Sequence, residues 1–277
     1  MKVTVVIPLY NPLPDYYQEV SLRQCARILA PKYPVTIVAP EDLQLDSYYA
    51  IFEEEANVTV KKNGFPASFF DSLTAYNSLM LSPFFYETFE AYDYVLIHQS
   101  DAFVFYDALD YFCNLGYDYI GAPWFKSFFG KSYSNCFSGA GNGGFSLRRV
   151  SACLEVLNYK ERFLPWRELL STNNSPLVKW KKLLPEQRKR IQFRFNVEFY
   201  TQINTRTEDY FWALDVPAAG LPFRVAPPNV AMQFAFEQKP KFLFNRTGKL
   251  PFGCHAWQRY EFESFWKPAI ERYGYNF

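Results

Sequence analysis

The stretch YDYVLIHQSDAFVFY, residues 92–106, contains two apolar runs separated by a polar turn. Tyr94–Ile97 is apolar throughout and predicts a buried strand, and Ala102–Phe105 predicts a short strand beyond the turn. The turn between them carries Gln99 and Asp101. Because ligands of open parallel sheets bind outside the carboxyl ends of strands, this turn is a candidate site. Asp101 there can hold a divalent cation that bridges a diphosphate, or it can simply cap the turn.

Strand-like and helix-like segments alternate on the amino-terminal side of this stretch. Apolar, β-branched runs predict strands, and longer amphipathic runs predict helices. We expect strands at Val3–Leu9, Val35–Ala39 and Val58–Val60 (the last ended by Asn63-Gly64), and helices at 15–30 and 70–90, the second interrupted at Ser82-Pro83. This alternation predicts an α/β fold with a mostly parallel central sheet flanked by helices.

Composition narrows the class of protein. The chain has 277 residues, of which 49% are hydrophobic and 20% aromatic, and a net charge of +1. So many aromatic residues argue against disorder, and the balanced charge argues against a nucleic-acid partner. Five cysteines without a C-x-x-C pair favour free thiols, and no apolar run approaches 18 residues. We expect one domain over 1–277 in the cytoplasm.

One region departs from this charge balance. Residues 160–194 hold ten Lys or Arg against three Glu, with Trp166 and Trp180 among them. We predict a basic insertion at 160–195 that is peripheral to the sheet. It is either a solvated segment or a contact with anionic lipid at the inner face of the membrane, made through Lys179, Lys181 and Lys182.

A glycine-rich segment, SGAGNGGF at 138–145, formally matches G-x-G-x-x-G. As a dinucleotide loop it would need a preceding strand, which the polar residues before it do not indicate, and an acid such as Glu161. A second interpretation is a loop where backbone approaches a bulky ligand, followed by a helix from about Leu147. A plain flexible loop is the third.

Two further segments carry candidate chemistry. Thr205-x-x-Glu208 matches a capping box, in which Glu208 would bind only the backbone at a helix start. Asp209 follows in the first helical turn and can serve as a general base towards a hydroxyl. His255 lies in a turn rich in Pro, Gly and aromatics, where it either packs or joins Asp101 on a cation.

Taken together, these segments resemble known proteins. VVIPLYN (5–11) resembles the opening strand of GT-A glycosyltransferases. The remaining motifs resemble a bacterial family known only as a domain of unknown function, which is regarded as glycosyltransferase-like and is associated with surface polysaccharide synthesis. These motifs are DYVLIHQSDAFVF (93–105), GYDYIGAPW (116–124), GNGGFSLR (141–148), Glu208-Asp209 and PFGCHAW (251–257). The resemblance extends from about residue 3 to residue 260 and implies a GT-A-like fold.

The resemblance also implies roles for individual residues. Asp101 matches the final Asp of the metal- and diphosphate-binding Asp-x-Asp motif, whose first Asp is replaced here by Gln99. Asp209 matches the catalytic base of inverting enzymes, and His255 matches a histidine that completes coordination of Mn²⁺ or Mg²⁺. Two groups complete the implied site: donor-binding residues Pro8, Tyr10 and Asn11, and the donor-sugar and acceptor loop Asn142, Gly143, Gly144, Trp124 and Glu208.

The implied reaction is transfer of a sugar, with inversion, from a nucleotide-sugar donor to a saccharide or lipid-linked acceptor. Asp209 would deprotonate the acceptor hydroxyl, which attacks the anomeric carbon. Two other classes stay open on the sequence alone. One is an NAD-dependent oxidoreductase that uses Gly139–Gly144, and the other is a non-catalytic sugar- or lipid-binding protein on the same fold.

Overall fold

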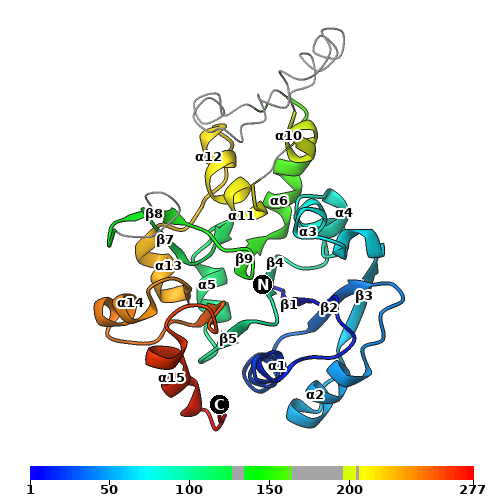
Figure 1. Ribbon diagram of the computed structural model, residues 1–277. Helices are drawn as coiled ribbons and strands as arrows, with labels where there is room; N and C mark the ends of the chain where they lie inside the picture. Colours follow the sequence, from blue (N-terminus) through cyan, green and yellow to red (C-terminus); the bar gives the residue numbers. More distant parts are fainter. Residues whose placement is uncertain (127–133, 162, 164–195, 204–205) are drawn as a thin grey trace.

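The computed structural model describes residues 1–126, 134–161, 163, 196–203 and 206–277. Its central sheet has six strands in the order β3-β2-β1-β4-β9-β6 (Figure 1). The first four in this order are parallel, β9 is antiparallel to β4, and β6 is antiparallel to β9. The strands are β1 (Val3–Pro8), β2 (Val35–Pro40), β3 (Lys61–Phe65), β4 (Tyr94–His98), β6 (Tyr119–Ile120) and β9 (Phe145–Arg149).

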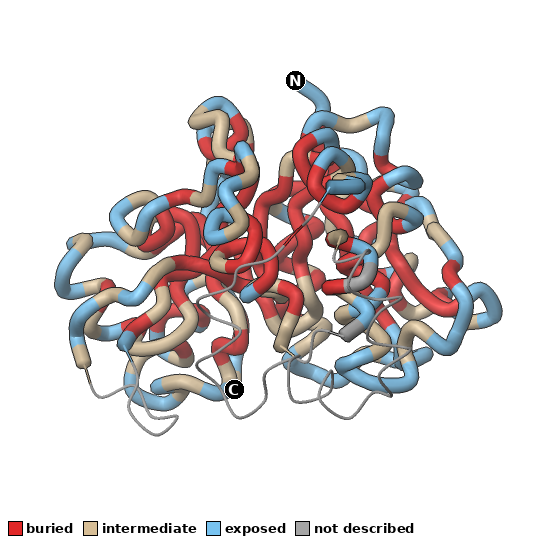
Figure 2. The backbone as a smooth tube through the Cα atoms, turned by 90° about the horizontal axis from the view of Figure 1, so that it is seen from above, coloured by how far each residue is buried: buried red, intermediate tan, exposed pale blue. Residues whose placement is uncertain are grey.

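Helices cover both faces of this sheet. Because successive side chains of a strand point to opposite faces, Val5 and Ile7 pack on one side and Val6 on the other. The first face packs against α1 (Tyr16–Ile28), α2 (Asp46–Ala56) and α5 (Leu109–Asn114). The second packs against α3 (Leu73–Met80), α4 (Pro83–Glu87) and α6 (Val150–Leu157). Buried residues therefore run through the middle of the molecule, with exposed ones at its rim (Figure 2).

Smaller elements extend the carboxyl-terminal half. A three-stranded sheet has the order β10-β11-β5, with β10 (Ala235–Phe236), β11 (Gly253–His255) and β5 (Ala102–Val104). A two-stranded sheet pairs β7 (Pro123–Phe125) with β8 (Phe137–Ala140). The remaining helices of the described residues are η1 (Ala67–Phe70), α10 (Val197–Ile203), α11 (Glu208–Tyr210), the π-helix η2 (Phe211–Asp215), α12 (Val216–Ala218), α13 (Pro228–Phe234), α14 (Pro240–Thr247), the π-helix η3 (Phe262–Trp266) and α15 (Lys267–Glu271).

The predicted mostly parallel α/β architecture is confirmed, but two local predictions are wrong. The third strand is Lys61–Phe65 rather than Val58–Val60. It pairs with β2 at the edge of the sheet, and only its last residue is buried, so it lacks the apolar run of a central strand. The helix expected from about Leu147 is instead the strand β9, and α6 begins at Val150.

The structure also corrects the interpretation of the glycine-rich segment. Strand β8 does precede Gly141, and Gly144 leads directly into β9, which is antiparallel to β4. A dinucleotide fingerprint needs a helix after the glycines, within a parallel βαβ unit. The segment is therefore a tight connection between strands, and the NAD-binding alternative loses its motif.

The basic insertion predicted at 160–195 lies outside the described residues, apart from Lys160, Glu161 and Phe163. Its proposed lipid-contacting lysines are among the residues that are not described. In the part of the chain that the structure describes, no helix has the length and apolar character needed to cross a membrane.

Candidate functional site

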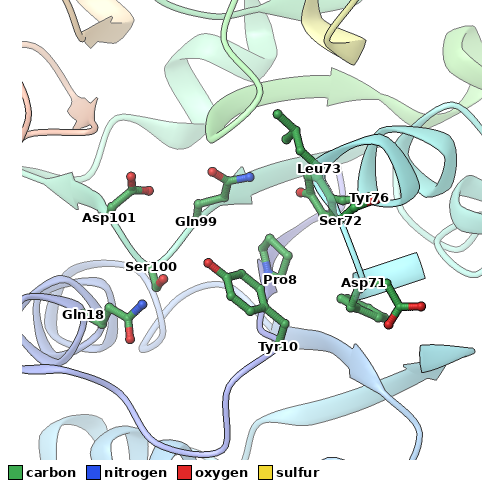
Figure 3. Close-up of a pocket in the computed structure, with 11 residues that line it drawn as sticks. Pro8, Tyr10, Gln18, Asp71, Ser72, Leu73, Tyr76, Gln99, Ser100 and Asp101 are labelled. Carbon is green, nitrogen blue, oxygen red and sulfur yellow. The ribbon is translucent and has the colours of Figure 1, made fainter. Parts of the chain in front are cut away.

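A cleft of about 480 Å³ opens at the carboxyl ends of β1 and β4. The chain passes from β1 outward to β2 and β3 and then returns to β4 on the other side of β1. This reversal is a topological switch point, the place where open α/β sheets bind ligands. Figure 3 shows Gln99, Ser100 and Asp101 on one wall, Pro8 and Tyr10 between, and Asp71, Ser72, Leu73 and Tyr76 opposite.

The three-stranded sheet brings His255 to the Gln99–Asp101 wall. His255 ends β11 and pairs with Ala102 of β5, so it lies beside the residue that precedes β5. Its Nε2 is 3.2 Å from Asp101 Oδ1 and 3.2 Å from Gln99 Oε1. Its Nδ1 is 3.2 Å from Oε1 of Glu237. The fold thus joins two segments that 154 positions separate in the sequence.

Residues Asn142, Gly143 and Gly144 form the connection between β8 and β9 above this cluster. The Asn142 side-chain oxygen accepts hydrogen bonds from the backbone N–H of Gly144 (2.9 Å) and Phe145 (2.7 Å). A Cβ atom at Gly144 would overlap Nε2 of His255 and lie 2.6 Å from Gln99 Oε1. Only glycine lets the backbone pass this close to the imidazole, so Gly144 is fixed by close approach.

Gly143 faces a second charged pair. A Cβ atom there would lie 2.7 Å from Glu208 Oε1. That carboxylate oxygen accepts a 2.8 Å hydrogen bond from Nη2 of Arg148, and the two side chains are 2% and 0% exposed. Arg148 also donates to the Tyr86 hydroxyl and the Ser146 hydroxyl, so its position is fixed from β9 and α4. The predicted capping box is wrong, because Thr207 is the N-cap and Glu208 pairs with Arg148. Thr205 itself lies outside the described residues.

Asp209 follows Glu208 in α11 but is partly exposed. Its carboxylate accepts hydrogen bonds from the Thr207 hydroxyl and, at 3.0 Å, from the Tyr210 backbone N–H. Trp124 stacks on Tyr210 with ring centroids 4.6 Å apart. The predicted loop residues Trp124, Gly143 and Glu208 therefore surround the start of this helix.

Burial and neighbouring charges shift the pKa values of these groups in different directions. Burial raises the pKa of Glu208 to about 7, although Arg148 pulls it down. Burial likewise raises the pKa of Asp209, with the Glu237 charge adding to the effect. Burial alone would lower the pKa of His255, but Asp101 and Glu237 outweigh it and raise the pKa to about 10. Burial opposes ionisation of Asp101 as well, yet the His255 charge keeps the pKa of that carboxyl below its usual value.

The donor set around Asp101 fits a divalent cation. Asp101 Oδ1 and Gln99 Oε1 each lie 3.2 Å from His255 Nε2. In an octahedral site with ligand bonds of about 2.1 Å, neighbouring ligands are about 3 Å apart. Gln99 supplies an amide oxygen, which is a weaker but suitable ligand for a hard cation. Among the described residues, no group of three or more His, Cys, Asp or Glu side chains is arranged as a metal site.

Four of the twelve sequence-predicted site residues line the cleft, and Asp209 is not among them. Pro8, Tyr10, Gln99 and Asp101 line the cleft, whereas Asn11 lines an adjoining pocket that shares Tyr10. Sequence reasoning missed three contributors: Tyr76 in the opposite wall, Glu237 behind His255, and Arg148 beside Glu208. The first two carry no local motif, and Arg148 stands at the end of the GNGGFSLR motif, where nothing local indicates a role.

The comparison with protein families agrees with the resemblance seen in the motifs. The chain belongs to the family described as "Protein of unknown function (DUF5672)", whose pattern matches residues 59–255. No curated protein sequence matches the chain. The predicted membership of a family of unknown function is therefore confirmed.

Solved structures with a similar course of the chain have low identity to it. TarS of S. aureus (residues 1–349) is 16% identical over 58% of this chain and 50% of its own, with a TM-score of 0.37. The apo form of the glycosyltransferase GlyE from Streptococcus pneumoniae TIGR4 is 12% identical over 92% and 54%, with a TM-score of 0.46. Apo mouse xyloside xylosyltransferase 1 is 11% identical over 92% and 97%, with a TM-score of 0.47. The chain spans about half the length of the TarS and GlyE chains that it matches.

Proposed function

We propose that the protein is an inverting glycosyltransferase that moves a sugar from a nucleoside diphosphate donor to an acceptor hydroxyl. One observation carries the proposal. The motif residues Gln99, Asp101, Gly144 and His255 meet beside a cleft at the switch point of the sheet. A cleft in this position suits a nucleotide ligand, and these motifs resemble those of a glycosyltransferase-like family.

In this proposal Pro8, Tyr10, Gln99 and Asp101 bind the donor in the cleft that they line. Asp209 accepts the proton of the acceptor hydroxyl, and the hydroxyl oxygen forms a bond to the anomeric carbon. The bond from that carbon to the phosphate oxygen breaks, and the nucleoside diphosphate leaves with the electron pair. Attack from the face opposite the leaving group inverts the anomeric centre.

The choice of Asp209 rather than Glu208 follows from access. Glu208 is 2% exposed at its side chain and is held by Arg148, so an acceptor cannot reach it without displacing the glycine connection. Asp209 is partly exposed, and burial raises the pKa of its carboxyl towards the range of a useful general base. Adjacent helical residues point about 100° apart, so the side chains of Glu208 and Asp209 face different surroundings.

A divalent cation, Mn²⁺ or Mg²⁺, would be held by Asp101, Gln99 and His255. Its chemistry there would be to offset the negative charge that develops on the leaving diphosphate. The neighbouring residues Asn142, Gly143 and Gly144 position the donor sugar by bringing backbone, rather than side chains, close to this point.

The resemblance to a family associated with surface polysaccharide synthesis favours a saccharide or lipid-linked acceptor. We propose that such an acceptor is met at the cytoplasmic face of the membrane, with contact made by the basic residues of 160–194.

A panel of nucleotide sugars tests the proposed activity. Each donor is scored by thermal shift and by release of its nucleoside diphosphate, with and without Mn²⁺. We expect one donor class to raise the melting temperature and to be turned over. If no donor binds or reacts across uridine, guanosine, cytidine and thymidine diphosphate sugars, the proposed function is wrong.

Asp209→Asn then tests the proposed base. This change keeps size and polarity but removes the proton acceptor, so turnover should fall by roughly 10²–10⁴-fold with donor affinity nearly intact. Tyr210→Phe, at the next position, is the matched control and should keep turnover within a few-fold. Near-normal turnover of Asp209→Asn, or a product that retains the donor's anomeric configuration, would contradict the mechanism.

A further inference from the structure

Three side chains meet at one end of the small sheet β10-β11-β5. Glu237 directly follows β10, His255 ends the central strand β11, and Asp101 directly precedes β5. Phe236 of β10 is in register with Cys254 of β11, so Glu237 and His255 are lateral neighbours. The imidazole therefore has a carboxylate on each side, each 3.2 Å from a different ring nitrogen.

The two sides of the imidazole are not equivalent. Nε2 faces the Asp101 carboxylate and the Gln99 amide oxygen, which are the proposed cation ligands. Nδ1 faces Glu237, whose ionised carboxylate only accepts hydrogen bonds. Without a cation, the two carboxylates favour a ring that carries a hydrogen on both nitrogens. When a cation displaces the hydrogen from Nε2, Nδ1 keeps its hydrogen for Glu237, and Nε2 offers a lone pair beside the oxygens of Asp101 and Gln99.

Asn142 presents a competing contact to the same nitrogen. Its side-chain nitrogen is 3.3 Å from Nδ1, because its oxygen is occupied by the N–H groups of Gly144 and Phe145. If the amide donated to Nδ1, the ring hydrogen would lie on Nε2 and block the cation. A hydrogen bond to a carboxylate is about twice as strong as a neutral one, so Glu237 rather than Asn142 decides the state of Nδ1. Once a cation occupies the Asp101 side of the ring, Glu237 therefore keeps the hydrogen on Nδ1.

Glu237 also bears on the charge of the site. The Asp-x-Asp motif supplies two carboxylates, but Gln99 leaves Asp101 as the one carboxylate on the Gln99–Asp101 wall, since Asp71 lies on the opposite wall (Figure 3). Glu237 is 18% exposed at its side chain and places a second negative charge behind the imidazole. A carboxylate in this position fixes the ring and raises the basicity of the ligating nitrogen.

We propose that Glu237 is a positioning residue for the cation site: it holds His255 with Nδ1 protonated and Nε2 directed at the cation, and its charge stands in for the carboxylate that Gln99 does not provide. This inference rests on the cation site within the proposed function. It concerns a residue that no sequence motif indicated.

The first test measures Mn²⁺ affinity of the full chain by electron paramagnetic resonance of free Mn²⁺, without any donor. Loss of a carboxylate behind a ligating histidine typically weakens metal binding 10–100-fold, and we expect this for Glu237→Gln. Glu263→Gln, which removes an exposed carboxylate, is the control and should bind Mn²⁺ like the wild type. Gln99→Asp in the Glu237→Gln background should recover most of the lost affinity.

The second test reads the tautomer, which a merely structural role would not change. The chain has two histidines, and burial lowers the pKa of His98 to about 4, so its neutral ring is an internal reference. In ¹⁵N spectra with diamagnetic Cd²⁺ as probe, wild-type His255 should show a protonated Nδ1 and a metal-bound Nε2. Glu237→Gln should show a mixture of tautomers when the metal is removed and the ring is neutral.

Unchanged Mn²⁺ affinity of Glu237→Gln, or Cd²⁺ bound through Nδ1, would overturn the inference. So would a wild-type protein that turns over donor but binds no Mn²⁺, a result that leaves the proposed function standing. Conversely, tight Glu237-dependent Mn²⁺ binding with no donor bound or consumed would support this inference and overturn the proposed function.

Discussion

Two charged clusters lie on either side of the Gly143–Gly144 connection, and they differ in access to water. The Arg148–Glu208 pair beside Gly143 is 0% and 2% exposed. The Asp101–His255–Glu237 cluster beside Gly144 has side chains that are 35%, 14% and 18% exposed. The same type of ionic contact therefore lies in the closed interior of the protein at Arg148–Glu208, and in the wall of a cleft at Asp101–His255–Glu237. Burial, more than the presence of opposite charges, decides what each pair can do.

Breaking the sealed pair should have the largest effect on stability. Arg148→Met leaves the Glu208 carboxylate buried without its charged partner, which typically costs about 3–5 kcal/mol of unfolding free energy. Urea denaturation at pH 7 measures this loss. Arg149→Met is the matched control on the same strand, because Arg149 is 35% exposed and its loss should cost much less.

The double variant Arg148→Met/Glu208→Met checks the cause. Replacing both charges with apolar side chains removes the uncompensated carboxylate, so stability should exceed that of Arg148→Met alone. A single variant that loses less than about 1 kcal/mol would show that the pair is not sealed as described.

The sealed cluster should also make stability depend on pH through Glu208. Burial raises the pKa of this carboxyl from 4.5 to about 7 in the folded protein. The folded state therefore holds this proton more tightly than the unfolded state does. The resulting stabilisation is fully present below pH 4.5 and is lost as pH rises through 7. Relative to Glu208→Gln, the wild type should lose about 3 kcal/mol of unfolding free energy across this range.

Urea denaturation of both proteins at several pH values between 4.5 and 7.5 measures the difference. The other titrating groups are common to both proteins, so they largely cancel. A difference between wild type and Glu208→Gln that stays constant with pH would contradict the raised pKa of Glu208.

Breaking the open cluster should have the smallest effect on stability. Asp101 is 35% exposed, and solvent screens its attraction to His255. Asp101→Asn should therefore change the unfolding free energy of metal-free protein by at most about 1 kcal/mol. Asp71→Asn, on the opposite wall of the cleft, serves as control. A loss of several kcal/mol for Asp101→Asn would contradict the prediction, because the partly exposed cluster would then stabilise the fold as much as the buried pair does.

The sequence predicts the interior of the sheet better than its edges. The β-branched runs of β1, β2 and β4 are buried on both faces, so their composition is dictated by burial. By contrast β3, an edge strand, is polar, and the sequence pattern predicts its start three residues too early. Strand β9 ends in Arg148-Arg149, and nothing local shows that the first arginine is buried.

The same limit applies to the candidate site. The residues Asp101, Gly144, Asp209 and His255 carry motif signals, and each lies in or beside the charged clusters. Arg148 and Glu208 are 60 positions apart, and Glu237 reaches His255 only through strand pairing. Contacts of this kind depend on the register of strands, which single-sequence patterns do not specify.

The position of β11 in the chain determines when the candidate site can form during protein synthesis. Ribosomes add about 5–20 residues per second, so residue 98 at the end of β4 precedes His255 by about 8–30 s. During that interval a growing chain can pair β1 to β4 and form the Gln99–Asp101 wall without its imidazole. The central strand of the β10-β11-β5 sheet arrives last among its three strands, and with it the histidine. A chain that has not yet reached β11 therefore has a ligand cleft but not its complete set of polar groups, and the site is completed only when His255 has been added.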